Sequence, residues 1–422
     1  MYKELFQLAK KEGLEQFQIL ETSIENLSIQ TFNDKIEKFE TSNIVEYLVN
    51  AIYEEKEVSI HTELLNEEII ECLKEQAKYL EIKNLPTKKL LEDIKEEASY
   101  QINSPSITAN RLQNLEKLKK EYPTLKEINT DYEESIIQRR IITENNELYD
   151  IKKERVFFVE VMVQENEINS TFYNSKQNIE DKDIDVETLT KEVIENAIDK
   201  LHYQPIQSGI YQVILTSKVM GSILNKFIDL FSADSLQKDT SLLVGKQNKQ
   251  VFSSKVSIIE DPWNKTLIGK RLFDNKGTKT YYKEIVKNGV FQQALYDERT
   301  AIIDNVNTTG NDYGEISVRN LYIKKGEKSL DELISSLEKG ILIDSVVGLH
   351  AGINPINGDI SLQSEGYYIE NGKKKYATKL FVLSTNIMDI LNNVIELSNQ
   401  VECHLKTTSS PDILLKNITI SK

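Results

Sequence analysis

Few imidazole or thiol side chains in this sequence are available for catalysis or metal binding. The histidines and cysteines are His61, His202, His350, His404, Cys72 and Cys403. His350 has the most suggestive setting, because Gly348 and Gly352 would let the backbone of a ligand approach closely. The structural alternative is that the glycines shape a tight connection after a strand and His350 makes an internal hydrogen bond. Imidazole serves both purposes, so the sequence leaves both open.

A second candidate is the short segment Thr309-Gly310-Asn311. Its amides could point outward and hold a carbonyl group of a bound chain. It could equally be a plain turn, since Gly and Asn tolerate positive φ. The basic run Lys373-Lys374-Lys375 follows a hairpin signal and is expected to be a solvated loop, too short for a nucleic-acid surface.

An amphipathic helix is predicted from about residue 217 to 232. Its apolar stripe consists of Met220, Ile223, Leu224, Phe227, Ile228 and Phe231. Asp229 and Asp234 could be paired carboxylates, but charges on such a helix are usually solvated face or cap residues. Taken alone, the pattern predicts a helix that packs on a sheet.

The elements that would position these residues fall into two groups that meet at Gln204-Pro205. Short alternating runs over residues 15–60 predict an antiparallel meander, broken at Asn33-Asp34 and Thr41-Ser42-Asn43. Helices are expected over 63–80, 107–121 and 185–201, and strands over 136–142 and 156–163. Residues 1–204 are therefore expected to form an antiparallel sheet with helices.

Residues 205–422 are predicted to form a β-rich, barrel-like domain with a few helices. Asn288-Gly289 and Asn371-Gly372 predict type I′ hairpins, whose two central residues both need positive φ. Strands are expected at 211–215, 251–259, 279–296, 316–324, 341–347, 359–369, 376–384 and 413–420, and short helices at 329–338 and 386–398. The fold class is α+β, with domains 1–204 and 205–422.

Charge is divided unequally between the two parts. The 422 residues carry 52 Lys and Arg against 67 Asp and Glu, a net charge of −15. Residues 1–200 hold 26 basic and 43 acidic side chains, and residues 201–422 hold the remaining 26 and 24. An acidic chain with no basic stripe argues against direct binding of nucleic acid, which requires clustered Lys and Arg.

Other classes are disfavoured as well. The N-terminus predicts a short amphipathic helix and not a signal peptide. No window approaches the ~18 uninterrupted apolar residues that a membrane span needs. Two cysteines far apart in the chain argue against a disulfide framework and favour a reducing compartment. We therefore expect a cytoplasmic protein without membrane contact.

Short motifs occur in a recognisable order along the chain. They are Ser208–Leu215, Ser241-Leu242-Leu243, Gly245-Lys246, Gln250-Val251-Phe252, Glu260-Asp261-Pro262, Phe273–Gly277, Asn288-Gly289-Val290, Thr308–Asn311, Gly340–Ile343, Gly348–Gly352, Asn357–Ser361 and Ile369–Lys373. With these motifs the chain resembles the TldD/PmbA family, also called modulator of DNA gyrase and peptide maturation protein. The resemblance covers nearly the whole chain and is most specific after residue 205.

The resemblance implies one of two branches. In the catalytic TldD branch, the helix after the first strand of the second domain carries His-Glu-x-x-x-His, with two zinc ligands and a general base. Ligands five residues apart lie about 140° apart on a regular helix, so that site needs a local π-type widening. The equivalent positions here are Asn225, Lys226 and Leu230. We therefore expect the PmbA (TldE)-like, non-catalytic branch, with no catalytic residue, metal ligand or cofactor in this chain.

The resemblance also implies partners. These are a TldD-type catalytic subunit, which would hold the zinc, or a second copy of the chain, and extended or unfolded peptides. The candidate peptide-binding residues are then His350, Gly348, Gly352, Thr309, Gly310 and Asn311. Two alternatives stay open. One is a self-sufficient peptidase with ligands rebuilt from His350, Cys403, His404 and an aspartate. The other is a regulator that acts on DNA gyrase indirectly, through protein contacts.

Overall fold

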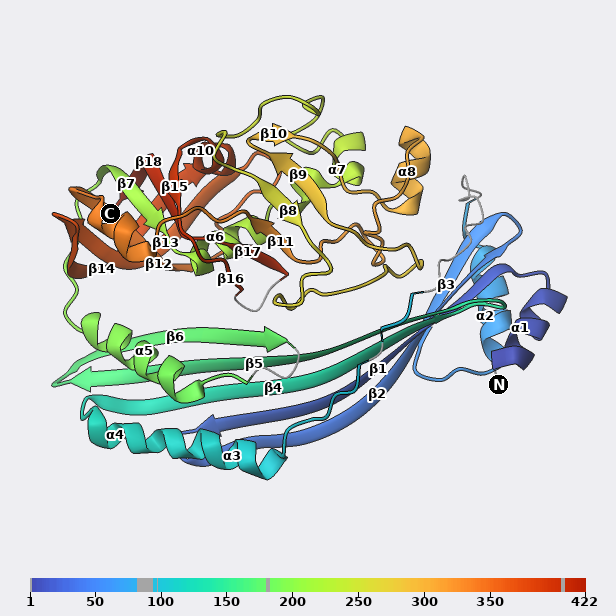
Figure 1. Ribbon diagram of the computed structural model, residues 1–422, viewed down its shortest axis with the longest axis horizontal. Coiled ribbons are helices and arrows are strands. Elements are labelled where there is room, and N and C mark those ends of the chain that lie inside the picture. Colours follow the sequence, from blue (N-terminus) through green and yellow to red (C-terminus); the bar gives the residue numbers. More distant parts are fainter. Residues whose placement is uncertain (1, 82–93, 97, 180–182, 404–406) are drawn as a thin grey trace.

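The N-terminal part of the chain forms one long sheet. The computed structural model describes residues 2–81, 94–96, 98–179, 183–403 and 407–422. Its first sheet is antiparallel, curves into a half-barrel, and has the order β3-β2-β1-β4-β5-β6 (Figure 1). The strands are β1 (Glu15–Phe32), β2 (Lys35–Tyr53), β3 (Lys56–Thr62), β4 (Leu125–Ile142), β5 (Glu147–Glu165) and β6 (Ile168–Ile179). The expected antiparallel sheet with helices is confirmed.

The strands are longer than the sequence pattern predicts. The expected break at Thr41-Ser42-Asn43 is wrong, because β2 continues through it and pairs Thr41 with Leu27 and Asn43 with Glu25 of β1. Polar residues are tolerated here because β3 reaches only the later half of β2, so the earlier half is a solvent-exposed edge. The turn at Asn33-Asp34 is where the strand does end.

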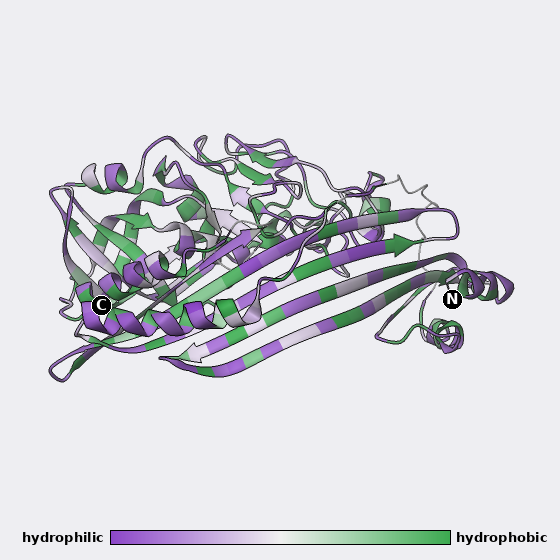
Figure 2. Ribbon diagram, turned by 60° about the horizontal axis from the view of Figure 1, so that its bottom comes forward, coloured by the Kyte–Doolittle hydropathy of each residue, from purple (hydrophilic) through white to green (hydrophobic). Residues whose placement is uncertain are grey.

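The two faces of this sheet differ, and polar and apolar residues alternate along its strands (Figure 2). On one face, apolar side chains such as Leu27, Ile29 and Phe157 pack with residues of α3 and α5 in a buried cluster. The other face lies toward the C-terminal domain (Figure 1). The helices are α1 (Tyr2–Lys11), α2 (Glu68–Ala77), α3 (Pro105–Gln113), η1 (Asn114–Lys117), α4 (Leu118–Glu121) and α5 (Val186–Asp199).

The C-terminal part contains a closed barrel, which confirms the barrel-like expectation. Strands β14-β13-β12-β7-β18 close because β14 pairs with β18 as well as with β13, and β15 extends this sheet. A second sheet has the order β10-β9-β8-β11-β17-β16. The strands are β7 (Gly209–Leu215), β8 (Ile258–Glu260), β9 (Lys283–Lys287), β10 (Val290–Phe291), β11 (Leu321–Ile323), β12 (Lys339–Val347), β13 (Asp359–Glu370), β14 (Lys373–Asn386), β15 (Val394–Leu397), β16 (Glu402–Cys403), β17 (Thr408–Ser410) and β18 (Ile413–Ser421).

Short helices pack against the sheets of the C-terminal part. They are α6 (Ser217–Asn225), η2 (Ile228–Phe231), α7 (Ala233–Gln237), α8 (Glu298–Asp304), α9 (Leu330–Ser335) and α10 (Ile387–Asn392). The apolar stripe predicted on residues 217–232 lies in the main core, with Met220, Ile223 and Phe231 fully buried. No helix among the residues placed by the structure is long and apolar enough to cross a membrane.

Local turn chemistry predicted the hairpins correctly. Asn288 and Gly289 have φ of 47° and 80°, and Asn371 and Gly372 have φ of 51° and 72°. The helix expected over 386–398 is only partly right, since α10 ends at Asn392 and the chain then forms β15, which pairs with β18. Strand pairing thus overrides helical periodicity there. Pro205 lies in the connection between α5 and β7, and the domain boundary placed there stays a prediction.

Candidate functional site between the two domains

The helix that would carry zinc ligands ends early. α6 stops at Asn225, so the prediction of one helix to residue 232 is wrong. The amide of Lys226 then donates to the carbonyl of Ile223 at 2.9 Å, and the next turn, Ile228–Phe231, is a 3₁₀ helix. Such three-residue spacing tightens the helix, whereas histidines five residues apart need it widened.

The side chains at the three zinc-site positions have other surroundings. Asn225 accepts a hydrogen bond from the Thr408 hydroxyl at 3.1 Å, Lys226 is exposed, and Leu230 is buried in the main core with 2% exposure. Within the described ranges, no group of three or more His, Cys, Asp or Glu is placed to hold a metal ion. Of the residues of the rebuilt-ligand alternative, His404 lies outside the described residues, and Cys403 is placed only by its backbone, opposite Ser409.

His350 lies on an exposed turn after β12. The amide of Gly352 donates to the carbonyl of Gly348 at 2.7 Å, and Gly348 has a φ of 87°. A Cβ on Gly352 would lie 2.2 Å from the carbonyl oxygen of Ser361, so only glycine fits there. The backbone therefore requires both glycines, and a peptide contact by His350, Gly348 or Gly352 stays a prediction.

Thr309, Gly310 and Asn311 are buried, whereas His350 is exposed. The Thr309 hydroxyl donates to Asn311 Oδ1 at 2.8 Å, and Asn311 Nδ2 donates to Glu260 Oε1 at 2.8 Å. Gly310 has a φ of 73°, and a Cβ there would lie 2.9 Å from the Lys279 carbonyl oxygen. This segment therefore braces Glu260 from inside the domain, and its proposed direct contact with a peptide stays a prediction.

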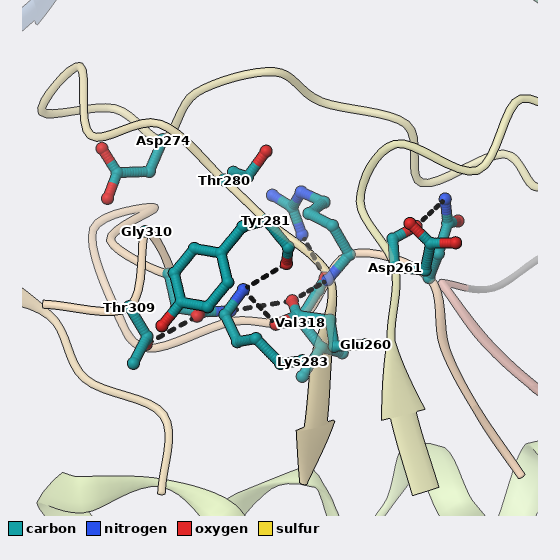
Figure 3. A network of polar contacts seen from close by, with 12 residues as sticks. Glu260, Asp261, Asp274, Thr280, Tyr281, Lys283, Thr309, Gly310 and Val318 are labelled. Carbon is teal, nitrogen blue, oxygen red and sulfur yellow. Dashed lines mark hydrogen bonds and ion pairs between the residues drawn. The ribbon is translucent and has the colours of Figure 1, made fainter. Parts of the chain in front are cut away.

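Glu260 forms a fully buried ion pair with Lys283, whose Nζ lies 2.9 Å from Glu260 Oε2 (Figure 3). Lys283 also donates to the Tyr281 carbonyl at 3.1 Å. The other carboxylate oxygen of Glu260 accepts the backbone amide of Arg319 at 2.7 Å. Each member of the pair thus has additional hydrogen bonds, which buried charges require. The network fixes the backbone at Arg319.

Asn320 continues this arrangement into the next loop. Its side-chain oxygen accepts the amide of Gly269 at 2.7 Å, and its side-chain nitrogen donates to the Asp261 carbonyl at 3.1 Å. A Cβ on Gly269 would lie only 2.6 Å from the Asn320 side-chain oxygen. Arg319 and the loop around Gly269 are therefore held next to each other by buried polar contacts.

A cavity of about 680 Å³ lies where these loops face the N-terminal sheet. The sheet contributes Asp131, Glu133, Lys152, Glu154, Val156, Phe158 and Gln177. The C-terminal domain contributes Ile268, Gly269, Arg271, Arg319 and Thr407. The volume is within the range of ~300–1,000 Å³ usual for ligand pockets.

Charges are segregated across the cavity. The sheet side contributes three acids and Lys152, which pairs with Glu154, and the other side contributes the two arginines. Burial and the nearby Asp131 raise the pKa of Glu133 above its ordinary value. Burial and the charge of Arg271 lower the pKa of Lys152 to about 8. Lys152 also donates to the carbonyl of Ile268 at 2.8 Å, and so bridges the two sides.

The loop that forms one wall of the cavity is anchored on the sheet. Arg139 donates to the carbonyl of Phe273 at 3.1 Å and to Asn275 Oδ1 at 2.7 Å, and Asp150 accepts the amide of Leu272 at 3.0 Å. The Phe273 ring is fully buried in an apolar cluster whose other members are Leu20, Ile141 and Leu148 of the sheet. The cavity wall is thus a docked segment of the C-terminal domain.

Asp274 organises the same loop. Its buried carboxylate accepts the amides of Lys276 at 3.0 Å, Thr278 at 2.9 Å and Asp312 at 3.2 Å. Burial, together with the nearby charge of Asp312, raises the pKa of Asp274 to about 7. Three motifs flagged in the sequence, Glu260–Pro262, Phe273–Gly277 and Thr308–Asn311, therefore converge behind one wall of the cavity.

Residues 208–422 match the family described as the PmbA/TldA metallopeptidase C-terminal domain. The chain belongs to the PmbA/TldD family. This match includes the whole barrel, the second C-terminal sheet and the loops that wall the cavity. The family predicted from the sequence motifs is confirmed.

Curated relatives of this PmbA/TldD chain are named metalloproteases. It is 26% identical over 249 residues to a metalloprotease PmbA homolog of Buchnera aphidicola, which covers 59% of this chain and 54% of the relative. It is 27% identical to a PmbA homolog of Haemophilus influenzae, over 53% of this chain and 49% of the relative. The chain thus spans about half the length of the curated relatives it matches.

Solved structures match the whole chain. A protein described as a proposed modulator of a DNA gyrase from Thermotoga maritima is 25% identical, with a TM-score of 0.88 over 100% of this chain and 99% of that one. TldE from Thermococcus kodakarensis has a TM-score of 0.89 over all of both chains at 17% identity, which shows a shared fold. The curated PmbA homologs support a PmbA-like member of the family, and the TldE structure adds the shared fold.

Sequence reasoning missed the sheet side of the cavity. In β4, Asp131 and Glu133 alternate with the buried Tyr132 and Glu134. This period of two indicates two dissimilar faces. The alternation was visible in the sequence, but only the tertiary structure shows that Asp131 and Glu133 face the loops of the other domain.

Proposed function

We propose that this chain is a peptide-binding subunit of a TldD/PmbA-type zinc metalloprotease and has no catalytic zinc of its own. The observation that carries the proposal is which residues occupy the positions where the family resemblance implies zinc ligands. Asn225, Lys226 and Leu230 occupy the expected ligand and base positions, and Leu230 belongs to the barrel core. Zinc needs His, Cys or carboxylate ligands, which these side chains do not offer.

The proposal assigns each task to a separate chain. A TldD-type partner supplies His-Glu-x-x-x-His, the zinc and the activated water. This chain supplies surface for extended or unfolded peptides, and the cavity between its domains is the leading place for such contact. The pair acts in the cytoplasm. In the absence of the catalytic partner, the chain associates with a second copy of itself.

Reconstitution tests this division of tasks. The purified chain is mixed with a family member that bears the zinc motif, and hydrolysis of an unstructured peptide is followed. We expect little activity from this chain alone and a strong increase in the mixture. A partner whose motif glutamate is changed to glutamine is the control and should abolish the activity. Full activity of this chain without the partner would contradict the proposal.

Metal analysis tests the self-sufficient alternative. The chain is purified without chelator, and its transition metals are measured by mass spectrometry. We expect substoichiometric zinc. One equivalent of a transition metal per chain, lost together with peptidase activity in a His350→Ala variant, would favour rebuilt ligands over a subunit role. Light scattering of the same sample, with and without partner, reports the proposed association.

A further inference from the structure

Two arginines in the inter-domain cavity have no acidic partner. Arg271 donates from one terminal nitrogen to the carbonyl of Lys270 at 2.9 Å. Arg319 donates from one terminal nitrogen to the carbonyl of Val318 at 2.8 Å and to the hydroxyl of Ser317 at 3.3 Å. Neither guanidinium forms an ion pair with any carboxylate in the part of the chain that the structure describes. A guanidinium has five donors, so both retain capacity for a ligand.

Arg319 is held in place before any ligand arrives. Its backbone amide is fixed by Glu260, and its guanidinium lies 3.7 Å from the centre of the Tyr313 ring. Burial lowers the pKa of Arg319, which shows that its charge is poorly solvated. A weakly solvated, prepositioned guanidinium loses little on binding a carboxylate, and the planar fork can bind both oxygens at once.

The opposite side of the cavity restricts what the ligand can be. Asp131 Oδ2 accepts from Gln30 at 3.1 Å, while Asp131 Oδ1 is buried without a hydrogen-bond partner. Glu133 adds a further carboxylate, and Glu154 is already paired with Lys152. This surface repels a phosphate or a polyanion and needs hydrogen-bond donors or a cation. The ligand that fits both sides carries a carboxylate at one end and N–H or ammonium groups at the other.

We propose that the cavity binds the C-terminal end of a peptide, with its terminal carboxylate on Arg271 and Arg319. Backbone N–H groups or a basic side chain of the last residues then face Asp131 and Glu133. The cavity volume of about 680 Å³ holds a short chain end and not a folded domain. This inference rests on the proposed peptide-binding function and names the part of the peptide that is recognised.

Direct binding to the isolated chain tests the inference. The probe is a hexapeptide of glycine, alanine and one lysine, labelled with fluorescein at its N-terminus. It is made once with a free C-terminal carboxylate and once as the C-terminal amide. Fluorescence anisotropy should show at least about ten-fold tighter binding of the free acid. Equal affinities for the acid and the amide, or no binding of either, would overturn the inference.

Variants locate the carboxylate site. Arg271→Gln and Arg319→Gln should each bring the affinity for the free acid close to that for the amide and leave amide binding unchanged. Arg299→Gln is the matched control, because Arg299 is an exposed arginine paired with Asp234 and does not line the cavity. Arg319→Lys keeps the charge but removes the fork, and should recover only part of the affinity. Thermal unfolding of each variant confirms that it folds.

Competition and reconstitution separate the possible failures. Inorganic phosphate is tested as a competitor. If phosphate displaces the labelled acid as effectively as the unlabelled peptide does, the site is a general anion site and the peptide assignment is overturned. Hydrolysis in the mixture with the zinc-bearing partner is measured for both peptides. Equal stimulation on acid and amide would leave the subunit function intact and reject the carboxylate site. Selective binding of the acid without stimulated hydrolysis would support the carboxylate site and reject the subunit function.

Discussion

The C-terminal barrel and the N-terminal half-barrel differ in where their polar residues lie. The C-terminal part closes its barrel and buries a continuous apolar core, and in its second sheet the buried charges of Glu260 and Lys283 are paired. The N-terminal half-barrel stays open, and its face toward the other domain carries Asp131 and Glu133 beside a cavity. We therefore expect the C-terminal core to provide stability and the open sheet to provide the ligand site.

The comparison also bears on the positions where the family resemblance implies zinc ligands. Leu230 lies in the main core, where a histidine would place an unsatisfied polar group. If the barrel serves stability and the cavity serves binding, substitutions in the two regions should affect different measurements. The following variants test that separation.

The largest effect is expected for Lys283→Met. It leaves the Glu260 carboxylate buried without its counter-charge, which should lower the free energy of unfolding by about 3–5 kcal/mol. Urea denaturation measures the loss. The control is Lys287→Met, which removes an exposed lysine paired with Glu284 and should change stability by less than about 0.5 kcal/mol. Similar losses in both variants would break the contrast between a buried ion pair of the C-terminal part and an exposed one.

Leu230→Ala should be the next most damaging. It removes a core side chain at a position where the family resemblance implies a zinc ligand, and should cost about 2–5 kcal/mol. Lys226→Ala, at the exposed base position one turn earlier, should stay within about 0.5 kcal/mol. Calorimetric unfolding of the two variants compares them. A neutral Leu230→Ala would mean that this helix is not part of the structural core.

Asp274→Asn should change the pH dependence of stability. Because the folded pKa of Asp274 is raised to about 7, the folded state binds its proton more tightly than the unfolded chain does. Protonated Asp274 therefore contributes to stability below the pKa that it has in the unfolded chain, and this contribution is lost as the pH rises through about 7. The asparagine variant lacks this loss, so it should be more destabilised relative to wild type at pH 4 than at pH 8. Denaturation at both pH values measures the difference, and a penalty independent of pH would refute the assignment.

The smallest effect on stability is expected for Glu133→Gln on the open sheet. The raised pKa of Glu133 means that its charge is slightly unfavourable in the folded state near neutral pH. Removing it should leave stability unchanged or increase it by less than about 0.5 kcal/mol. The same variant should weaken binding of the lysine-containing peptide in the anisotropy assay. A large loss of stability would show that this face is structural.

Local signals in the sequence predicted much of the fold. Asn288-Gly289 and Asn371-Gly372 specify their hairpins because positive φ is a property of the residues themselves. The apolar stripe of residues 217–232 is buried as predicted, but its helix is divided after Asn225. Residues 386–398 contain helical periodicity and still contribute a strand. In the second case, pairing with the distant strand β18 outweighed local preference.

The candidate site was much less predictable. Thr309, Gly310 and Asn311 were flagged as peptide contacts, but they are buried and brace Glu260 and, through it, Arg319. Arg319 and Asp131 carry no local signal of a site, because an isolated charge in a strand or loop is usually solvated. Their role depends on the docking of one domain on the other.

By itself, the sequence determined the family, the absence of histidine and glutamate at Asn225, Lys226 and Leu230, and the hairpins. These follow from residue identity and local backbone preference. Only the tertiary structure decided that Leu230 belongs to a closed core and that Arg271 and Arg319 face Asp131 across a cavity. The reason is physical: burial and electrostatic complementarity are properties of surfaces brought together by folding, and these surfaces come from segments far apart in the chain.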